Sequence, residues 1–571
     1  MDRLGEPLRA GLEKAGASLQ RYYDLIFGLC SLPFIWQISN NIAIPLRFED
    51  ALIVLRYARN LVAGHGFVYN LGEPIMGVTT PLYTLLSTLF VLAGGEHAPA
   101  VQNVAGVLFL VLQAWLAARI VRRTHSALLG LLTAVLILTN LNFNYLYFGM
   151  ETHCFAFLVL LAFYLFLERK ETWTGVVLGV AFLTRYDAAL LALLIGLAML
   201  FERRRLPFRL TLAFFAVVTP WLAFSMLYFQ SILPSSLGAK EGYYPAIAYI
   251  RVVFDYYQEY FAALAGVFRL GEGAKILLGG GFPVLAAVGA WSLARVGWRN
   301  MVLIAYGALQ VVIYAFLGPD PGFRWHYYTL NPILTILFLV GLFEIFKLGI
   351  HWATKVARGK QPVARSLLAT VQMVALGLAV LHLARASAHT FRLDPHSRQL
   401  YDMAAWLDSH YDDETSLLQP SIGILGYETN MRMIDHAGLV TRGLYYYDSS
   451  NHTPMAEVMR LYQPDLVLIP QGEDEGLTEH GYLLVHTFRD PSTYLLYERG
   501  NLESFRKGLQ LEEPLSEEDF PPPDLEPLAE LDESELFSLL VEPELSDAAS
   551  LPWLPLESEL FWSAEPLPLS A

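Results

Sequence analysis

The chain has 571 residues, of which 54% are hydrophobic, 13% aromatic and only 16% charged. This composition is too apolar for an ordinary soluble enzyme and indicates a membrane protein. The formal net charge of −15 belongs to the C-terminal tail, because residues 512–565 contain 17 Asp and Glu and no Lys or Arg. The rest of the chain is close to neutral, so the acidity says nothing about the membrane-embedded part.

A charged N-terminal segment, residues 1–21, precedes a series of apolar stretches and is predicted to be cytoplasmic. Many of these stretches approach or exceed the roughly 20 residues that a helix needs to cross a bilayer core. They favour helices over a β-barrel, whose strands would alternate between polar and apolar residues. A polytopic α-helical domain is therefore predicted at residues 22–384. About eleven spans are expected, at residues 22–44, 99–120, 126–141, 154–168, 172–184, 187–201, 208–230, 272–294, 300–317, 329–350 and 366–384.

The segment Thr80–Leu92 is also apolar, but it is short. If it lies in the membrane interface, the basic clusters of the short loops all fall on the side of the N-terminus, as the positive-inside rule requires. If it crossed the membrane, most of these clusters would face outward. We therefore predict an interfacial helix. The clusters are Arg122-Arg123, Arg169-Lys170, Arg203-Arg204-Arg205, Arg295 with Arg299, and residues 355–365.

With this orientation, a second set of loops faces outward together with everything after residue 384. The first outer loop is residues 45–98, and the others are residues 142–153, 185–187, 231–271 and 318–328. They hold most of the unusual polar residues of the chain, so the site is predicted to be extracytoplasmic. These residues are Glu49, Asp50, Arg56, Arg59, His65, Glu151, Arg185, Asp187, Lys240, Asp320, Arg324 and His326.

The sequence pattern changes after residue 384. Helical periodicity at Leu400–Ser409 is followed by short strand-like segments with Pro and Gly between them. We predict a small extracytoplasmic α/β domain at residues 385–500. Residues 501–571 form an acidic, Pro-rich tail whose composition predicts disorder. The strand-like segments are Ser416–Leu418, Met431–Asp435, Asp465–Ile469, Tyr482–Phe488 and Tyr494–Tyr497.

Glu49 and Asp50 follow the first span and open an amphipathic helix in which Arg56, Arg59 and Asn60 share one face. A carboxylate at a helix N-terminus is held ionised by the helix dipole and by free N–H groups, which suits a general base or a cation ligand. Asp50 alone would be interpreted as an N-cap. The other polar residues of the outer loops favour the catalytic interpretation.

Two cations are candidates to bind a phosphate leaving group. Lys240 and Arg324 lie in outer loops, and ammonium and guanidinium groups bind phosphate oxygens well. Each of them alone is explained equally well by snorkelling to lipid headgroups.

The remaining charged residues of the outer loops have a structural and a functional interpretation. Glu151 begins a span from the outside, and Arg185 and Asp187 are spaced for a local ion pair between two short spans. Intramembrane charges are usually functional or paired. The His residues show no metal-binding spacing, so no dedicated metal site is predicted.

Five motifs follow one another in the first outer loop: Glu49-Asp50-Ala51-Leu52-Ile53, Leu55-Arg56-Tyr57-Ala58-Arg59-Asn60-Leu61, Gly64-His65-Gly66, Tyr69-Asn70 and Gly72-Glu73. This run resembles the first outer loop of GT-C glycosyltransferases, particularly of actinobacterial terminal arabinofuranosyltransferases and, more distantly, of protein mannosyltransferases. The resemblance covers residues 20 to about 500. Weaker blocks follow in the expected order: Gly149-Met150-Glu151-Thr152, Leu183-Thr184-Arg185-Tyr186-Asp187, residues 233–240, the Arg324 loop and Ile434-Asp435-His436-Ala437-Gly438-Leu439.

The resemblance implies a polyprenyl-phosphate-linked sugar as donor and inverting transfer to a glycan, lipid or protein of the cell envelope. It implies a multi-pass plasma (inner) membrane protein with membrane lipids, and not nucleic acid, as its surroundings. In the family an acidic pair of the first outer loop carries the catalytic base. That pair is Glu49 and Asp50 here, and since the first position is more often Asp in the family, either carboxylate is a candidate.

In the same resemblance, Lys240, Arg324 and Arg59 would bind the lipid phosphate. No cofactor is required, although a divalent cation held by the acidic pair and Glu151 is compatible with these residues. The other candidate substrate or phosphate ligands are Arg56, His65, Glu151, Arg185, Asp187 and His326.

Three other functions are alternatives to glycosyl transfer from a polyprenyl phosphate. A polymerase or ligase of lipid-pyrophosphate glycans would share the topology and the basic outer loops, but it would release a pyrophosphate lipid. A transporter would need polar residues near the middle of several spans, whereas the charges here gather at one face. A non-catalytic envelope protein would leave the motifs of the first outer loop unexplained.

Overall fold

The computed structural model describes most of residues 21–500, and all of these residues belong to one compact unit. The predictions for residues 1–20, for Lys240 and for the acidic tail beyond residue 500 lie outside the described residues. The gaps within the range are residues 40–48, 145–146, 236–244, 319–322, 357–360, 387–394, 420, 437, 442–443, 445, 449–450, 453–454 and 473–475.

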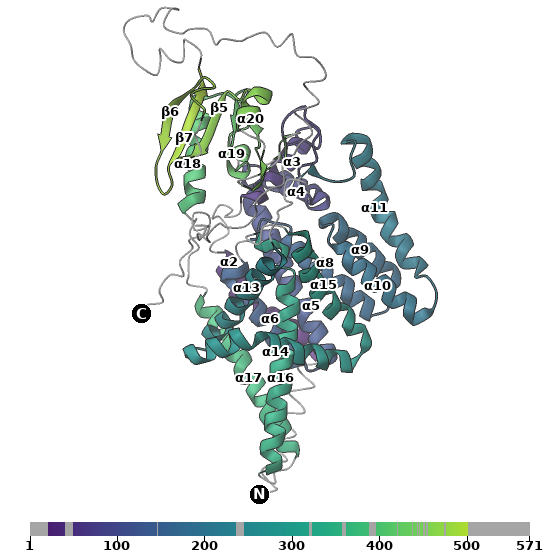
Figure 1. Cartoon of the computed structure of the whole chain (residues 1–571). Helices are drawn as coiled ribbons and strands as arrows, with labels where there is room; N and C mark the ends of the chain where they lie inside the picture. Colours follow the sequence, from purple (N-terminus) through teal and green to yellow (C-terminus); the bar gives the residue numbers. More distant parts are fainter. Residues whose placement is uncertain are drawn as a thin grey trace, which may run out of the picture. The chain divides into compact units, whose positions relative to one another are not determined.

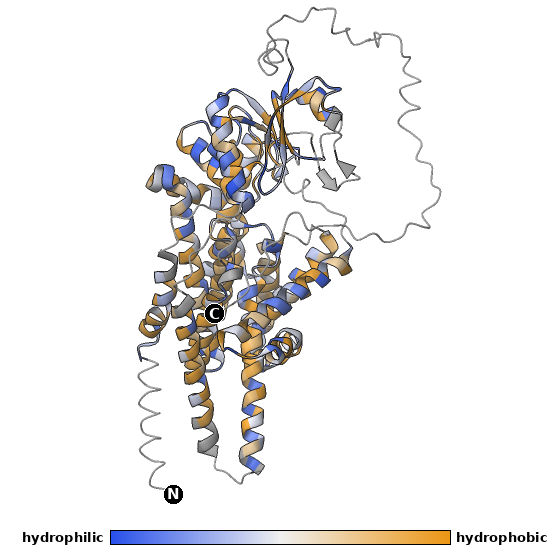
Figure 2. Ribbon diagram, turned by 90° about the vertical axis from the view of Figure 1, so that its left-hand side faces the viewer, coloured by the Kyte–Doolittle hydropathy of each residue, from blue (hydrophilic) through white to orange (hydrophobic). Residues whose placement is uncertain are grey.

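The body of the protein consists of packed helices (Figure 1), and each of the eleven predicted spans contains one. Their apolar character is visible along the long helices in Figure 2. The helices are α2 (Tyr23–Ser39), α3 (Asp50–Val62), α4 (Pro81–Gly94), α5 (Ala98–Thr124), α6 (Ala127–Thr139), α8 (Thr152–Leu167), α9 (Glu171–Thr184), α10 (Ala188–Arg203), α11 (Phe208–Tyr228), α13 (Ala246–Val267), α14 (Glu272–Val296), α15 (Met301–Leu317), α16 (Leu330–Val356) and α17 (Gln361–Ala386), with short turns at α7 (Leu141–Asn144), η1 (Gly95–His97), η3 (Trp298–Asn300) and η4 (Arg324–His326).

Among the described residues, six helical segments are long and apolar enough to cross a membrane. They include α11, α14 and α16, and the stretch Pro81–Thr124 in which η1 joins α4 to α5. A membrane protein is thereby confirmed. The other predicted spans coincide with the shorter helices α2, α6, α8, α9 and α10, so the count of eleven and the interfacial placement of Thr80–Leu92 stay predictions.

The helix α13 lies within residues 231–271, for which the sequence predicts an outer loop without a helix. Its aromatic residues recur at helical spacing, and Tyr249, Tyr256, Tyr257 and Tyr260 are all buried. The Tyr257 hydroxyl lies 2.7 Å from the carbonyl oxygen of Tyr327, just before α16. Charged residues interrupt the apolar run of α13, which hides this amphipathic helix from a search for continuous hydropathy.

The C-terminal domain contains the five predicted strands. They form one sheet in the order β2-β1-β5-β7-β6, in which β1 is parallel to β2 and β5, and β7 is antiparallel to β5 and β6. The predicted helix at Leu400–Ser409 is also present, as part of α18. The elements are α18 (Pro395–His410), β1 (Ser416–Leu418), α19 (Gly423–Glu428), β2 (Arg432–Ile434), β3 (Tyr446–Asp448), β4 (Asn451–His452), α20 (Met455–Tyr462), β5 (Leu466–Pro470), β6 (Tyr482–Phe488) and β7 (Tyr494–Arg499).

Two glycines bring α14 and α16 into close contact within the body. A Cβ atom on Gly289 would overlap the carbonyl oxygen of Leu337, and one on Gly341 would overlap that of Leu285. Small residues at a helix crossing let the two backbones approach, which favours packing where no hydrophobic effect drives helices together.

We expect Gly341→Val to destabilise the protein by about 1–3 kcal/mol, because the larger side chain separates α14 from α16. Thermal unfolding in lipid or detergent measures the change. The matched control is Gly349→Val on the same helix, where nothing lies within 4 Å of an added Cβ. Equal unfolding temperatures for the two variants would contradict the role of this contact.

Candidate functional site

The acidic pair, Glu49 and Asp50, stands at the beginning of α3, as predicted. The helix is more deeply enclosed than an amphipathic surface helix, because nine of its thirteen residues are buried. On one side lies α19 of the C-terminal domain (Figure 1), which begins at Gly423. The start of the first outer loop is thus held inside the protein.

The carboxylate of Glu49 faces the C-terminal domain. Its Oε1 accepts a hydrogen bond from the backbone N–H of Gly423 at 2.7 Å. Burial and the neighbouring charge of Asp50 raise the pKa of Glu49 to about 7, against hydrogen bonds from Gly423, Ser421 and Ile424 that lower it. Glu49 therefore takes up a proton far more readily than an exposed glutamate.

Arg56 is 3% exposed, and its N–H groups donate hydrogen bonds to main-chain carbonyl groups. Its Nε donates to the carbonyl oxygen of Tyr69 at 3.0 Å, and its Nη2 donates to that of Met431 at 2.6 Å. Its Nη1 donates to the carbonyl oxygen of Gly426 in α19. The guanidinium that the sequence suggested as a phosphate ligand thus joins the first outer loop to the C-terminal domain.

Arg59 and His65 lie further along the same segment. Arg59 Nη1 donates to the carbonyl oxygen of Tyr427 at 2.8 Å, and its guanidinium lies 4.8 Å from the centre of the Tyr427 ring. His65 is exposed and follows the C-terminal end of α3. A helix of 13 residues is roughly 20 Å long, so His65 is not brought to the acidic pair.

The rest of the first outer loop also docks on the C-terminal domain. The Asn70 side chain pairs with the backbone of Met433 like a neighbouring strand, donating to its carbonyl oxygen at 2.9 Å and accepting its N–H at 3.0 Å. Glu73 and Arg432 form an ion pair of 2.7 Å. Sequence reasoning quoted Asn70 and Glu73 only as motif residues, because the partners of such groups are set by the tertiary fold.

A second group of charges lies at the ends of α8, α9 and α15, and we call it the Arg185 cluster: Glu151, Arg185, Asp187 and Tyr314. Arg185 pairs with Glu151 at 3.1 Å and with Asp187 at 3.2 Å. The Tyr314 hydroxyl donates to Asp187 at 2.9 Å. The predicted local ion pair is present, and the structure adds Glu151 and Tyr314 to it.

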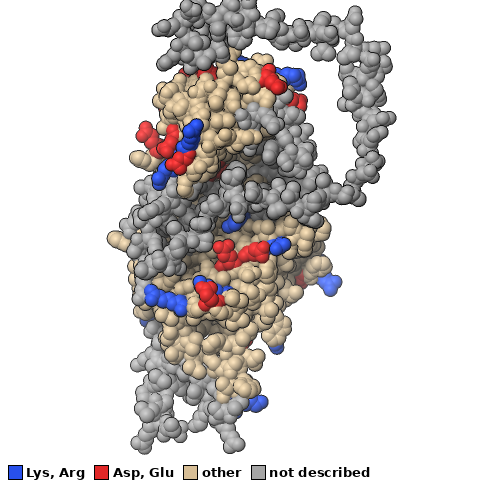
Figure 3. Space-filling model, turned by 60° about the vertical axis from the view of Figure 1, so that its left-hand side comes forward, with Lys and Arg blue, Asp and Glu red and all other residues tan. Residues whose placement is uncertain are grey.

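The turn at Arg324–His326 packs on this cluster. Arg185 Nη1 lies 3.4 Å from the carbonyl oxygen of Trp325, and the His326 ring stacks on Tyr314 at 5.0 Å between centres. Burial raises the pKa of Tyr147, and the positive charge of Arg324 opposes this shift, which puts Arg324 near the loop that precedes Glu151. Figure 3 shows that charges on the protein's surface, in contrast, lie in small groups of mixed sign on the face it presents.

The helix α5 connects the acidic pair to the Arg185 cluster. Gln102 Nε2 lies 3.5 Å from the carbonyl oxygen of Ala51, next to the acidic pair. Gly106, one turn further along α5, is packed against the carbonyl group of Phe148, just before Glu151. Since one helical turn rises about 5.4 Å, adjacent turns of α5 contact the segment that follows Asp50 and the segment that precedes Glu151.

Buried polar atoms without a protein partner surround this connection. Within the described part of the chain, Thr80 Oγ1, Gln102 Oε1 and Thr152 Oγ1 make no hydrogen bond. Buried polar groups are rarely left unsatisfied, so each calls for water or a ligand group. Thr152 belongs to the block Gly149-Met150-Glu151-Thr152 quoted from the sequence, whereas Thr80 and Gln102 were not singled out, because Thr and Gln are common in apolar segments.

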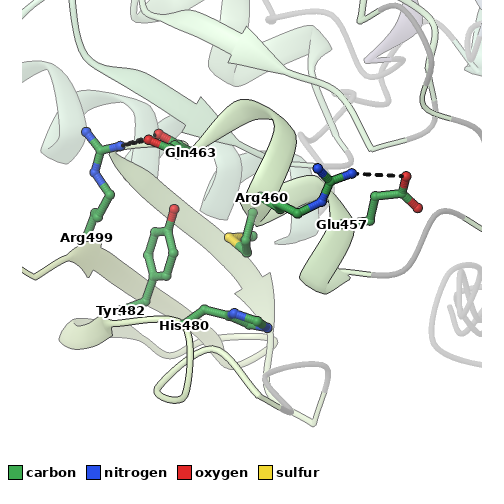
Figure 4. Close-up of a pocket in the computed structure, with 7 residues that line it drawn as sticks. Glu457, Arg460, Gln463, His480, Tyr482 and Arg499 are labelled. Carbon is green, nitrogen blue, oxygen red and sulfur yellow. Dashed lines mark hydrogen bonds and ion pairs between the residues drawn. The ribbon is translucent and has the colours of Figure 1, made fainter. Parts of the chain in front are cut away.

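A hollow of about 740 Å³ lies elsewhere, in the C-terminal domain between α20 and the sheet. Figure 4 shows its Arg460 paired with Glu457 and its Arg499 pointing to Gln463. None of the site residues predicted from the sequence lines it. The lining residues are Glu457, Met459, Arg460, Gln463, His480, Tyr482 and Arg499.

The residues considered for a divalent cation do not fit one. Glu49 is engaged by donors of the C-terminal domain, and Glu151 is paired with Arg185. Among the described residues, no group of three or more His, Cys, Asp or Glu could hold a metal ion.

Comparisons with solved structures show a shared fold. ArnT from Cupriavidus metallidurans is similar in its apo state, with a TM-score of 0.53 at 14% identity, and bound to undecaprenyl phosphate, with a TM-score of 0.54 at 13% identity. Each match covers 84% of this chain and 98% of that chain. The archaeal oligosaccharyltransferase AglB from Archaeoglobus fulgidus, in complex with an inhibitory peptide and a dolichol-phosphate, has a TM-score of 0.50 at 12% identity and covers 85% of this chain and 75% of that one.

These likenesses confirm the predicted fold class, a polytopic helical body followed by a small sheet domain. A family model described as a domain of unknown function, DUF8728, matches residues 389–501. No curated protein matches the sequence.

The raised pKa of Glu49 predicts how stability depends on pH. A carboxyl group whose pKa rises on folding, here from 4.5 to about 7, contributes stability at low pH that is lost as the pH rises through 7. Glu49→Gln cannot ionise, so we expect it to be closest to the parent below about pH 4.5 and to be more stable than the parent at pH 8, by up to about 3 kcal/mol. Thermal unfolding across this pH range measures the difference.

The control for this measurement is Glu414→Gln, in which an exposed glutamate is replaced. It should follow the parent at every pH. A constant difference between Glu49→Gln and the parent from pH 5 to pH 8 would rule out titration of Glu49 in this range.

Proposed function

We propose that this protein is an inverting GT-C glycosyltransferase, which moves a sugar from a polyprenyl-phosphate carrier to an acceptor of the cell envelope. The observation that carries the proposal is the contact of adjacent turns of α5 with Ala51, next to the acidic pair, and with Phe148, which precedes Glu151. A base and a cation are the two groups that such a transfer needs. The fold supports it, since ArnT was solved with undecaprenyl phosphate and AglB with a dolichol-phosphate.

The reaction is a single displacement at the anomeric carbon. A carboxylate of the acidic pair takes the proton of an acceptor hydroxyl, and the acceptor oxygen forms a bond to the anomeric carbon. The bond from that carbon to the phosphate oxygen breaks, and the polyprenyl phosphate leaves with the electron pair. One displacement from the opposite side inverts the configuration, and a phosphate leaving group needs charge stabilisation more than protonation.

The cations have different tasks in this proposal. Arg324 and Lys240 stabilise the charge of the leaving phosphate, and Arg59 of the first outer loop is the third cation assigned to this task. Arg185 is already paired with two carboxylates, so it orders the wall of the site together with His326 and its turn. Arg56 and His65 are assigned no contact with the reacting groups, because the first is saturated by carbonyl groups and the second lies at the far end of α3.

The location of the site follows from the orientation proposed from charge. The N-terminus is cytoplasmic, and the first outer loop and the C-terminal domain are extracytoplasmic in the plasma membrane. The described first outer loop and the C-terminal domain contact each other directly, for example through Glu73 and Arg432, which is consistent with one side for both.

A second candidate is transfer of a preassembled glycan from a lipid pyrophosphate. It is favoured by the likeness to AglB, an oligosaccharyltransferase, at a TM-score of 0.50. The leaving group distinguishes the two candidates, since only this second reaction releases a polyprenyl pyrophosphate.

We expect purified full-length protein in lipid to release free polyprenyl phosphate from one member of a panel of polyprenyl-phosphate sugars. Asp50→Asn should lower this release on the order of 100- to 10,000-fold, because a general base contributes that much to the rate. Mass spectrometry of the lipid product measures it. The matched control is Asp255→Asn, an exposed position on α13.

Undiminished release by a folded Asp50→Asn variant would contradict the role of the acidic pair. Release of polyprenyl pyrophosphate, and only from a pyrophosphate-linked donor, would support the second candidate instead.

A further inference from the structure

The two carboxylates of the acidic pair point in different directions. Glu49 has helical dihedral angles, φ −56° and ψ −43°, so the Asp50 side chain leaves the helix axis about 100° away from it. The direction of Glu49 is fixed, because Gly423 N–H donates to its Oε1 at 2.7 Å. The Asp50 side chain therefore leaves α3 on a different side from Glu49.

The donors that hold Glu49 come from one short segment of the C-terminal domain. Besides Gly423, the hydroxyl of Ser421 and the backbone N–H of Ile424 donate to the carboxylate. A base that takes the proton of an acceptor hydroxyl needs a lone pair directed at the substrate. The lone pairs of Glu49 are directed at protein donors, which would have to be displaced first.

The contact between α3 and α19 continues beyond Glu49, and the contacting residues follow the same order in both helices. Glu49 meets Gly423, Arg56 meets Gly426, and Arg59 meets Tyr427. Gly423 and Gly426 pack closely against the first outer loop. A Cβ atom added to Gly423 would overlap Glu49, and one added to Gly426 would overlap Tyr69 and Arg56. These two glycines, three residues apart, thus form a face of α19 without side chains, against which the first outer loop packs closely.

We propose that Asp50 is the catalytic base and that Glu49 is a positioning residue, which fixes α19 of the C-terminal domain on α3 and thereby sets the direction of the Asp50 side chain. This inference rests on the proposed function. It makes residues 421–431 part of the site, although the hydrogen-bonded residues of the two segments are 353 and 370 positions apart in the pairs Tyr69–Ile422 and Arg56–Gly426.

The competing assignment makes Glu49 the base. A carboxyl group with a pKa of about 7 suits a general base near neutral pH, and burial gives Glu49 such a pKa. The charge of Asp50 acts on Glu49 through its proximity on α3. Burial raises the pKa of Tyr69 in the first outer loop and of Tyr401 on α18, and the charge of Glu49 adds to both shifts. A decisive experiment must therefore separate loss of charge from loss of the hydrogen bond.

The test compares Glu49→Gln, Glu49→Ala and Asp50→Asn in the full chain in lipid, with kcat and KM for release of polyprenyl phosphate. The glutamine amide oxygen still accepts the N–H of Gly423, so we expect kcat of Glu49→Gln within about tenfold of the parent, as for loss of one modest interaction. Glu49→Ala should lower kcat further with KM for the donor unchanged. Asp50→Asn should lose on the order of 100- to 10,000-fold.

A matched variant disturbs the same contact from the other side. Gly423→Ala keeps both carboxyl groups in the chain but places a Cβ against Glu49, and we expect it to lower kcat as Glu49→Ala does. The double variant should be no worse than the poorer single variant, because both remove one interaction. Glu49→Gln keeps the size of the side chain and tests the proposal even where Gly423→Ala fails to fold.

Two results would overturn the division of tasks in an active parent: Glu49→Gln as inactive as Asp50→Asn, or Glu49→Ala as active as the parent. A folded parent that releases polyprenyl phosphate from no donor would instead overturn the proposed function, and the division of tasks with it.

Discussion

The arrangement of the site depends on one buried charge. Arg56 is 3% exposed, and a guanidinium costs free energy to bury unless its N–H groups find acceptors. Its acceptors are the carbonyl oxygens of Tyr69, Gly426 and Met431, which belong to the first outer loop and to the C-terminal domain. The N–H groups of Arg56 thus find their acceptors only when these two distant segments have folded together. The first outer loop therefore depends on the C-terminal domain for its structure.

Arg185 is also buried, and the acceptors for its N–H groups are mainly side chains, the carboxylates of Glu151 and Asp187. Two carboxylates and one guanidinium leave an excess of one negative charge, and the Tyr314 hydroxyl shares it. Such a group orders the ends of α8, α9 and α15 and is poorly suited to attract a phosphate by itself. In the proposed reaction a phosphate would find its counter-charge in the adjoining turn of Arg324, which contacts Arg185 through the carbonyl group of Trp325.

Local patterns predicted the regular elements well where one physical rule dominated. The five strands of the C-terminal sheet have β-rich segments bounded by Pro and Gly, and each predicted span contains a helix because apolar runs of that length have no other way to satisfy their backbone in a membrane. The helices α13 and α19 were missed. The first mixes charges with aromatic residues, and the second is six residues long with two glycines, so packing and not propensity holds it.

The sequence by itself determined the class of the protein, the acidic pair after the first span and the residue types of the site, because composition, hydropathy and motif order are local properties. Only the tertiary structure decided what those residues do. It turned Arg56 toward carbonyl groups, paired Arg185 with Glu151, left His65 at the surface and joined Glu49 to the backbone N–H of Gly423. The reason is that the partner of a charged group is chosen by desolvation and geometry across hundreds of residues, which no spacing along the chain records.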